Sequence, residues 1–113
     1  MKAVFISHNQ ALTEEVEIIF QKLSVRGFTQ WTEVKGAGSI SGDPHMGTHT
    51  WPSLNNSILA IVDDNKVKDL LKELYELNSE VEEQGLRAFV WNIEVAFGIA
   101  RSRLAANSEY CDR

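Results

Sequence analysis

Cysteine and basic residues are scarce in this chain. Cys111 is the single cysteine among 113 residues, so no disulfide can form within the chain, and a lone thiol is typical of reducing compartments. The 11 lysines and arginines stand against 16 aspartates and glutamates, which gives a formal net charge of −5. Nucleic acid is therefore disfavoured as the main partner, because counterion release at phosphates requires a basic face.

Long hydrophobic runs are also missing. No apolar run approaches the roughly 20 residues that a membrane-spanning helix needs, and the apolar stretch near the N-terminus is too short for a signal peptide. We therefore expect a cytoplasmic protein. Hydrophobic residues still make up 43% of the chain, enough for one core, and the length predicts a single domain spanning residues 1–113.

The spacing of apolar residues predicts four strands and two helices. Short runs rich in β-formers predict the strands, at residues 3–7, 28–35, 56–62 and 86–93. Apolar residues at helical spacing predict the helices, at residues 11–27 and 65–83. Asn9 or Thr13 caps the first helix and Asp63 with Asp64 the second, while Gly27 and Gly85 are the expected stops.

This order is β-α-β-β-α-β and predicts an α+β, ferredoxin-like fold. Right-handed crossovers place both helices on one face of a four-stranded antiparallel sheet. Trp31, Phe89 and Trp91 then supply more apolar surface than two helices can cover. An open apolar face is typical of an interaction surface, so we expect a homo-oligomer that packs sheet against sheet. The alternative is that the C-terminal tail, residues 95–113, covers this face within a monomer.

A long loop joins the second and third predicted strands. Residues 36–52 hold four of the seven glycines and both prolines, and no hydrophobic period runs through them. A structureless loop of this length is uncommon in a compact domain and is usually functional or disordered.

Metal-ligating side chains gather in this loop. Imidazole suits zinc, copper or nickel, thioether suits Cu(I), and carboxylate suits harder ions. The candidate ligands are Asp43, His45, Met46 and His49, with His8, Cys111 or a neighbouring subunit able to complete a site. The competing interpretation is a polar loop that includes two histidines by chance.

No arrangement for catalysis is evident. Ser39, Ser41 or Thr48 can be paired with a loop histidine, but no nucleophile elbow or orienting acid accompanies them. We therefore expect a protein that is not an enzyme.

Two segments of the loop carry a resemblance to a known family. Residues 32–38 (TEVKGAG) resemble the TEVKGxG segment that opens the T-loop of P-II nitrogen-regulatory signalling proteins, at the same place in the topology. The resemblance extends from residue 1 to about 94. Residues 47–52 (GTHTWP) resemble a divergent P-II-like branch that is encoded beside heavy-metal efflux pumps.

The resemblance implies a homotrimer that binds adenine nucleotide in clefts between subunits. It also implies that the loop docks on a regulated protein, such as a membrane transporter. The positions it assigns to the nucleotide lie at the start of the loop, around the turn before the last strand and in the tail. They are Lys35, Gly36, Ala37, Gly38, Gly85, Arg87, Arg101 and Arg103.

Parts of the classical pattern are replaced. Residues 39–42 (SISG) stand where the classical loop has Arg-Gln-Lys-Gly, which serves 2-oxoglutarate sensing, and the loop lacks the tyrosine that is uridylylated. The leading hypothesis is therefore a trimeric P-II-like signalling protein with a small effector. The alternative is a metal-binding or metal-responsive protein working beside a heavy-metal efflux system.

Overall fold

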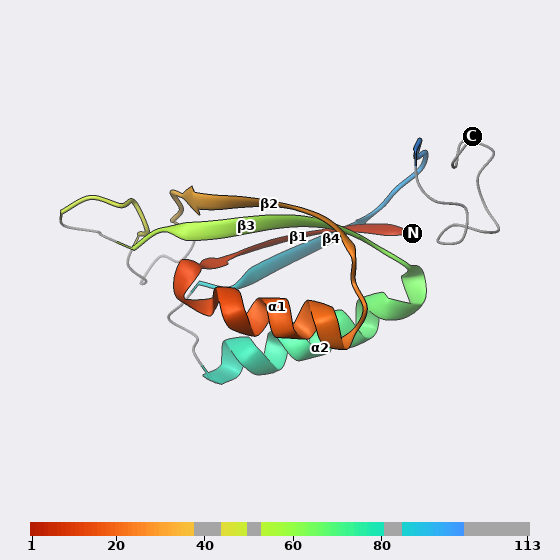
Figure 1. Cartoon of the computed structure of the whole chain (residues 1–113), viewed down its shortest axis with the longest axis horizontal. Helices are drawn as coiled ribbons and strands as arrows, with labels where there is room; N and C mark the ends of the chain where they lie inside the picture. Colours follow the sequence, from red (N-terminus) through yellow and green to blue (C-terminus); the bar gives the residue numbers. More distant parts are fainter. Residues whose placement is uncertain (38–43, 50–52, 81–84, 99–113) are drawn as a thin grey trace.

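The computed structural model describes residues 1–37, 44–49, 53–80 and 85–98 (Figure 1). The strands are β1 (Lys2–Asn9), β2 (Gly27–Val34), β3 (Asn55–Val62) and β4 (Arg87–Asn92). The helices are α1 (Thr13–Lys22), preceded by the 3-10 turn η1 (Gln10–Leu12), and α2 (Asp64–Glu80). Neither α-helix in the described part of the chain is long and apolar enough to cross a membrane.

The four strands form one antiparallel sheet in the order β2-β3-β1-β4. Both helices lie against the same face of this sheet (Figure 1). The predicted α+β, ferredoxin-like βαββαβ fold is therefore confirmed.

The core lies between the sheet and the helices. In β1, Val4 and Ile6 point toward the helices, and their partners across the sheet on β3 are Ala60 and Ile58. Val16, Ile19 and Phe20 of α1 and Leu70 and Leu74 of α2 close the core from the other side. Each large aliphatic side chain buried here contributes about 1.5–3 kcal/mol to the free energy of folding.

Helix α1 ends differently from the prediction. It stops at Lys22 rather than near Gly27, and Gly27 instead begins β2. Ser24 takes the left-handed conformation (φ 57°), and its N–H donates to the Gln21 carbonyl at 3.2 Å, while the Val25 N–H donates to Phe20 at 2.9 Å. These two bonds form a Schellman motif, which normally places glycine at the position that Ser24 occupies.

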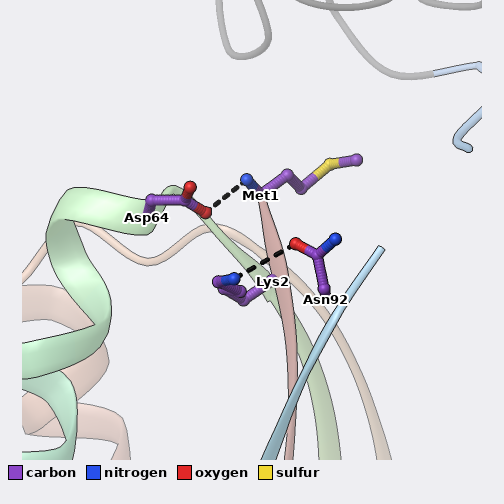
Figure 2. A network of polar contacts seen from close by, with 4 residues as sticks. All are labelled: Met1, Lys2, Asp64 and Asn92. Atoms are coloured by element: carbon purple, nitrogen blue, oxygen red, sulfur yellow. Dashed lines mark hydrogen bonds and ion pairs between the residues drawn. The ribbon is translucent and has the colours of Figure 1, made fainter. Parts of the chain in front are cut away.

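The start of β1 is fastened to the start of α2 (Figure 2). The terminal ammonium group of Met1 pairs with the Asp64 carboxylate, and Lys2 Nζ donates to Asn92 Oδ1 of β4 at 3.1 Å. The bond from the ammonium group holds the pKa of Asp64 below its usual value. Asp63 lies immediately before α2, as expected, and its carbonyl accepts the Lys66 N–H at 2.9 Å.

The second face of the sheet is uncovered by any described element. Phe5, Leu59 and Ile61 lie along its centre, on the two inner strands. On the two outer strands, Trp31 is 47% exposed, Phe89 59% and Trp91 50%. The expected open apolar face is therefore present. The alternative in which the tail covers it falls largely on residues 99–113, which lie outside the described part.

Candidate functional site at the base of the long loop

One end of the sheet gathers four strand ends. Because neighbouring strands are antiparallel, the last residues of β1 and β2 meet the first residues of β3 and β4 there. The segment between β2 and β3 leaves from this end, away from the N-terminus (Figure 1). Two of the predicted nucleotide segments, the start of the loop and the turn before β4, therefore lie at the same end of the fold. We use "loop base" for residues 33–36, 45 and 55–56.

A β-bulge opens the loop. Pairing of β2 with β3 shifts between Trp31 and Val34, and Glu33 takes a left-handed φ of 56°. The strand predicted at residues 28–35 is therefore regularly paired only as far as Trp31. The Glu33 N–H donates to Asn56 Oδ1 at 3.1 Å, and Asn56 Nδ2 donates to Thr13 Oγ1 of α1 at 2.8 Å. The buried Asn56 amide thus joins the bulge to the first turn of the helix.

The loop then closes on itself. The Gly36 N–H donates to the His45 carbonyl at 2.7 Å, and the His45 N–H donates to the Gly36 carbonyl at 2.5 Å. Further along, the Gly47 N–H donates to Ser53 at 3.1 Å, and the Gln10 N–H donates to Leu54 at 3.0 Å. The expectation of one structureless loop is therefore wrong for its base, which is held by backbone hydrogen bonds.

The imidazole of His45 is buried at this base. Its Nδ1 lies 2.5 Å from Asn55 Oδ1. An amide oxygen only accepts, so Nδ1 carries the hydrogen. Asn55 Nδ2 also lies 3.5 Å from Ser7 Oγ on β1. A Cβ built on Gly36 would approach Asn55 Nδ2 more closely than 3.0 Å, so the space beside this amide requires glycine at position 36.

Gly85, just before β4, lies near the same imidazole. Gly85 has a left-handed φ of 67°, and a Cβ built on it would lie 3.5 Å from His45 Cε1. Arg87, which pairs with Ser7 across β1 and β4, is exposed, and its Nη1 donates to the Leu86 carbonyl at 3.0 Å. Of the predicted nucleotide positions, the structure thus brings Gly36 and Gly85 to one histidine, with Arg87 on the adjoining strand.

The remaining predicted nucleotide positions are either exposed or outside the described residues. Lys35 and Ala37 are exposed beside the Gly36–His45 bridge. Gly36 already donates its N–H to the His45 carbonyl. Gly38, Arg101 and Arg103 lie outside the described residues, so their roles stay predictions.

The predicted metal ligands are dispersed. His45 is bonded to Asn55, Met46 is half-buried, and His49 is exposed. His8 lies fully buried on the helix side of β1, the opposite face from Ser7, and burial lowers the pKa of its imidazole. Among the described residues no three histidine, cysteine or acidic side chains come together. Asp43 and Cys111 lie outside those residues, so the metal site stays a prediction without a described cluster behind it.

Sequence reasoning missed the two asparagines that organise the loop base. Asn55 and Asn56 begin β3 and are 8% and 5% exposed. Asparagine is depleted in strands, so two in succession at a strand start were a signal of side-chain hydrogen bonding to nearby backbone.

The fold of the chain is similar to that of solved structures, whereas its sequence matches no known family. No protein-family model and no curated protein sequence matches the chain. CPII from Thiomonas intermedia K12, a nitrogen regulatory PII-like protein, has a solved structure bound to ADP and bicarbonate. It aligns with a TM-score of 0.66 at 23% identity, covering 81% of this chain and 84% of that chain.

Two further structures give the same result. CPII bound to ADP, AMP and acetate aligns with a TM-score of 0.62 at 17% identity, over 98% of this chain and 94% of that chain. A chain from Thermus thermophilus, assigned to the PII-like signaling proteins, aligns with a TM-score of 0.59 at 23% identity, over 81% and 85%. The resemblance noted in the sequence is therefore confirmed at the level of architecture: this chain has the fold of the PII-like signaling proteins.

Proposed function

We propose that the chain is a PII-like signalling protein that binds an adenine nucleotide at the end of the sheet where the loop begins. The observation that carries this proposal is that the loop base and Gly85, which precedes β4, lie at the same end of the sheet, with the position of a Cβ on Gly85 3.5 Å from His45 Cε1. A ligand held at this end therefore lies against the element that would contact a partner protein. The CPII structures with ADP, AMP and bicarbonate support the choice of ligand.

The residues at this end suit a phosphate group. Arg87 offers an exposed guanidinium, which binds phosphate oxygens through two N–H groups at once. Lys35 is a second exposed cation at the same end. Gly85 takes a left-handed φ, a backbone conformation that occurs where successive N–H groups form an anion site. Bound nucleotide would act here as a signal, and the proposal includes no catalytic step.

The proposal also includes a homotrimer. The uncovered sheet face carries Phe5, Leu59, Trp31, Phe89 and Trp91, and apolar area of this kind is normally buried against a partner. Packing three such faces together would bury them and would place clefts between neighbouring subunits. Light scattering tests this directly: a mass about three times the 12.7 kDa chain supports the trimer, and a mass near 12.7 kDa contradicts it.

Isothermal titration calorimetry tests the ligand. ADP, ATP and AMP are titrated into the purified protein, with and without bicarbonate, and Cu, Zn and Ni are titrated separately. We expect heat with an adenine nucleotide, and a loss of about tenfold or more in affinity on Arg87→Ala, because a charge-assisted bond contributes roughly 1.5–3 kcal/mol.

Arg26→Ala is the matched control. Arg26 is also exposed, but it precedes β2 and so lies at the opposite end of the sheet. Equal losses in the two variants would indicate a general charge effect and contradict the site. Heat from a metal alone, removed by His45→Ala with His49→Ala, would favour the metal-responsive alternative.

A further inference from the structure

We propose that His8 and Asn78 bind one buried water molecule between β1 and the last turn of α2. The water donates one hydrogen to His8 Nε2 and the other to Asn78 Oδ1, and so links the strand to the helix inside the core. Both residues belong to the layer between the sheet and the helices, so the inference does not depend on the proposed nucleotide site.

The two side chains present buried acceptors that lack a donor. The His8 ring is fully buried, and its Nδ1 lies 2.7 Å from the Asn9 carbonyl oxygen, which only accepts, so Nδ1 carries the hydrogen. Burial lowers the pKa of this imidazole, so the ring is neutral near pH 7 and its Nε2 is a bare acceptor. Within the part of the chain that the structure describes, neither His8 Nε2 nor Asn78 Oδ1 has a hydrogen-bond partner. Buried polar atoms are normally satisfied, so both call for a donor.

His8 and Asn78 lie at about the same distance from a common starting point. β1 and α2 start side by side, where Met1 pairs with Asp64, and both run toward the same end of the fold (Figure 1). Seven residue steps at about 3.3 Å carry the strand about 23 Å from Met1 to His8. Fourteen steps at about 1.5 Å carry the helix about 21 Å from Asp64 to Asn78.

The packing of the core supports this alignment. His8 continues a buried series on the helix side of β1 at every second residue, and Asn78 continues a series on α2 at every fourth. Two strand residues advance about 6.6 Å and four helix residues about 6 Å, so the two series keep in step. The preceding members of both series belong to one core cluster: Val4 and Ile6 on the strand, and Leu70 and Leu74 on the helix.

Water is the ligand that fits two bare acceptors in this setting. Two acceptors cannot bond to each other, so a molecule between them has to donate to both. The buried side chains at this end of the core, such as Leu12 and Leu86, are apolar, so a cation would lie there without a counter-charge. Water is neutral and donates two hydrogens, and a buried water typically makes two to four hydrogen bonds.

A high-resolution crystal structure of the unsubstituted chain tests the site directly. We expect one electron-density peak at about 2.5–3.2 Å from both His8 Nε2 and Asn78 Oδ1. Long-range proton–nitrogen correlation spectra near pH 7 should show that Nδ1 is the protonated ring nitrogen of His8. The lack of a peak between the two side chains would overturn the inference. A direct bond to His8 Nε2 from the Asn78 amide, turned by 180°, would overturn it as well.

Urea denaturation of substituted proteins tests the energetic link. In His8→Phe or Asn78→Leu the water loses one of its two partners, and the remaining acceptor stays buried. In the double variant both acceptors are gone, so the combined loss of stability should be smaller than the two single losses predict. We expect the product of the single changes in the unfolding equilibrium constant to exceed the change in the double variant about tenfold, a typical size for residues that share a partner.

His49→Phe combined with Asn78→Leu is the matched control pair, because His49 is an exposed histidine of the loop. These two changes should multiply to within a factor of about two, as expected for separate sites. Effects of His8→Phe and Asn78→Leu that also multiply to within this factor would contradict the link. If a His8 variant does not fold, the crystal structure and the spectra of the unsubstituted chain decide.

Discussion

Substituting Gly36 by alanine tests the packing of the loop base. The new Cβ would enter the space that Asn55 Nδ2 occupies, so the amide has to move by on the order of 1 Å to restore van der Waals contact. The planar amide moves as a unit, so its Oδ1 leaves His45 Nδ1, which it now meets at 2.5 Å. The variant therefore loses a buried hydrogen bond although neither His45 nor Asn55 is itself substituted.

The size of the effect follows from two opposing contributions. A buried donor left without its acceptor costs about 1–3 kcal/mol. Alanine returns about 0.4–1 kcal/mol by restricting the unfolded chain, because Gly36 does not need a left-handed backbone. We expect a net loss of about 1–2 kcal/mol in the free energy of unfolding. Urea denaturation followed by tryptophan fluorescence measures it, at one fixed protein concentration because self-association of a protein adds to its apparent stability.

A double-mutant cycle isolates the cause. In an Asn55→Ser background the clashing amide is absent, so Gly36→Ala should be neutral or slightly stabilising. Gly98→Ala is a useful contrast, because Gly98 has a left-handed φ of 83° and no atom within 4 Å of its Cβ position. That variant should show only a backbone cost, unaffected by Asn55→Ser. An equal loss for Gly36→Ala in both backgrounds would refute the packing explanation.

Three other substitutions test separate features. Ser24→Gly should raise the free energy of unfolding by about 1 kcal/mol, seen as a higher urea midpoint, because Ser24 holds a left-handed φ in the Schellman motif; a lower midpoint would contradict this assignment. Burial lowers the pKa of His8 from 6.5, so the unfolded chain binds a proton that the folded chain does not, and stability present above pH 6.5 is lost as pH falls below it. His8→Phe should flatten that part of the midpoint-against-pH curve relative to the unsubstituted protein, and parallel curves would argue against it. Trp91→Glu should lower the mass seen by light scattering, because it places a charge on the uncovered sheet face, whereas an unchanged mass would exclude that face from assembly.

The sequence predicted the elements well because their signals are local. Alternating and helical spacings of apolar residues depend on near neighbours, and β3, predicted at residues 56–62, is observed at Asn55–Val62. The end of α1 was misjudged for an equally local reason. Glycine is the usual left-handed residue after a helix, so the helix was predicted to stop at Gly27. In the structure Ser24 takes the left-handed conformation that ends the helix.

The candidate site depended on contacts that no spacing signals. The pairing of His45 with Asn55 and its approach to Gly85 join positions up to 40 residues apart. Gly36 illustrates the difficulty: the resemblance placed it among the nucleotide positions, and in the structure its N–H donates to the His45 carbonyl. Residues at one end of a fold can be expected from topology, but which side chains meet there depends on packing.

The two asparagines at the start of β3 have a consequence for how the loop can vary. Adjacent residues of a strand point to opposite faces, so Asn55 holds His45 on one side while Asn56 holds the Glu33 bulge on the other. The residues on both sides of the segment between Ala37 and Pro44 are thus held by a single dipeptide. Each doubling of the length of a flexible loop raises the entropic cost of closing it by only about 0.6 kcal/mol. Residues can therefore be inserted or removed between Ala37 and Pro44 at little cost to the fold.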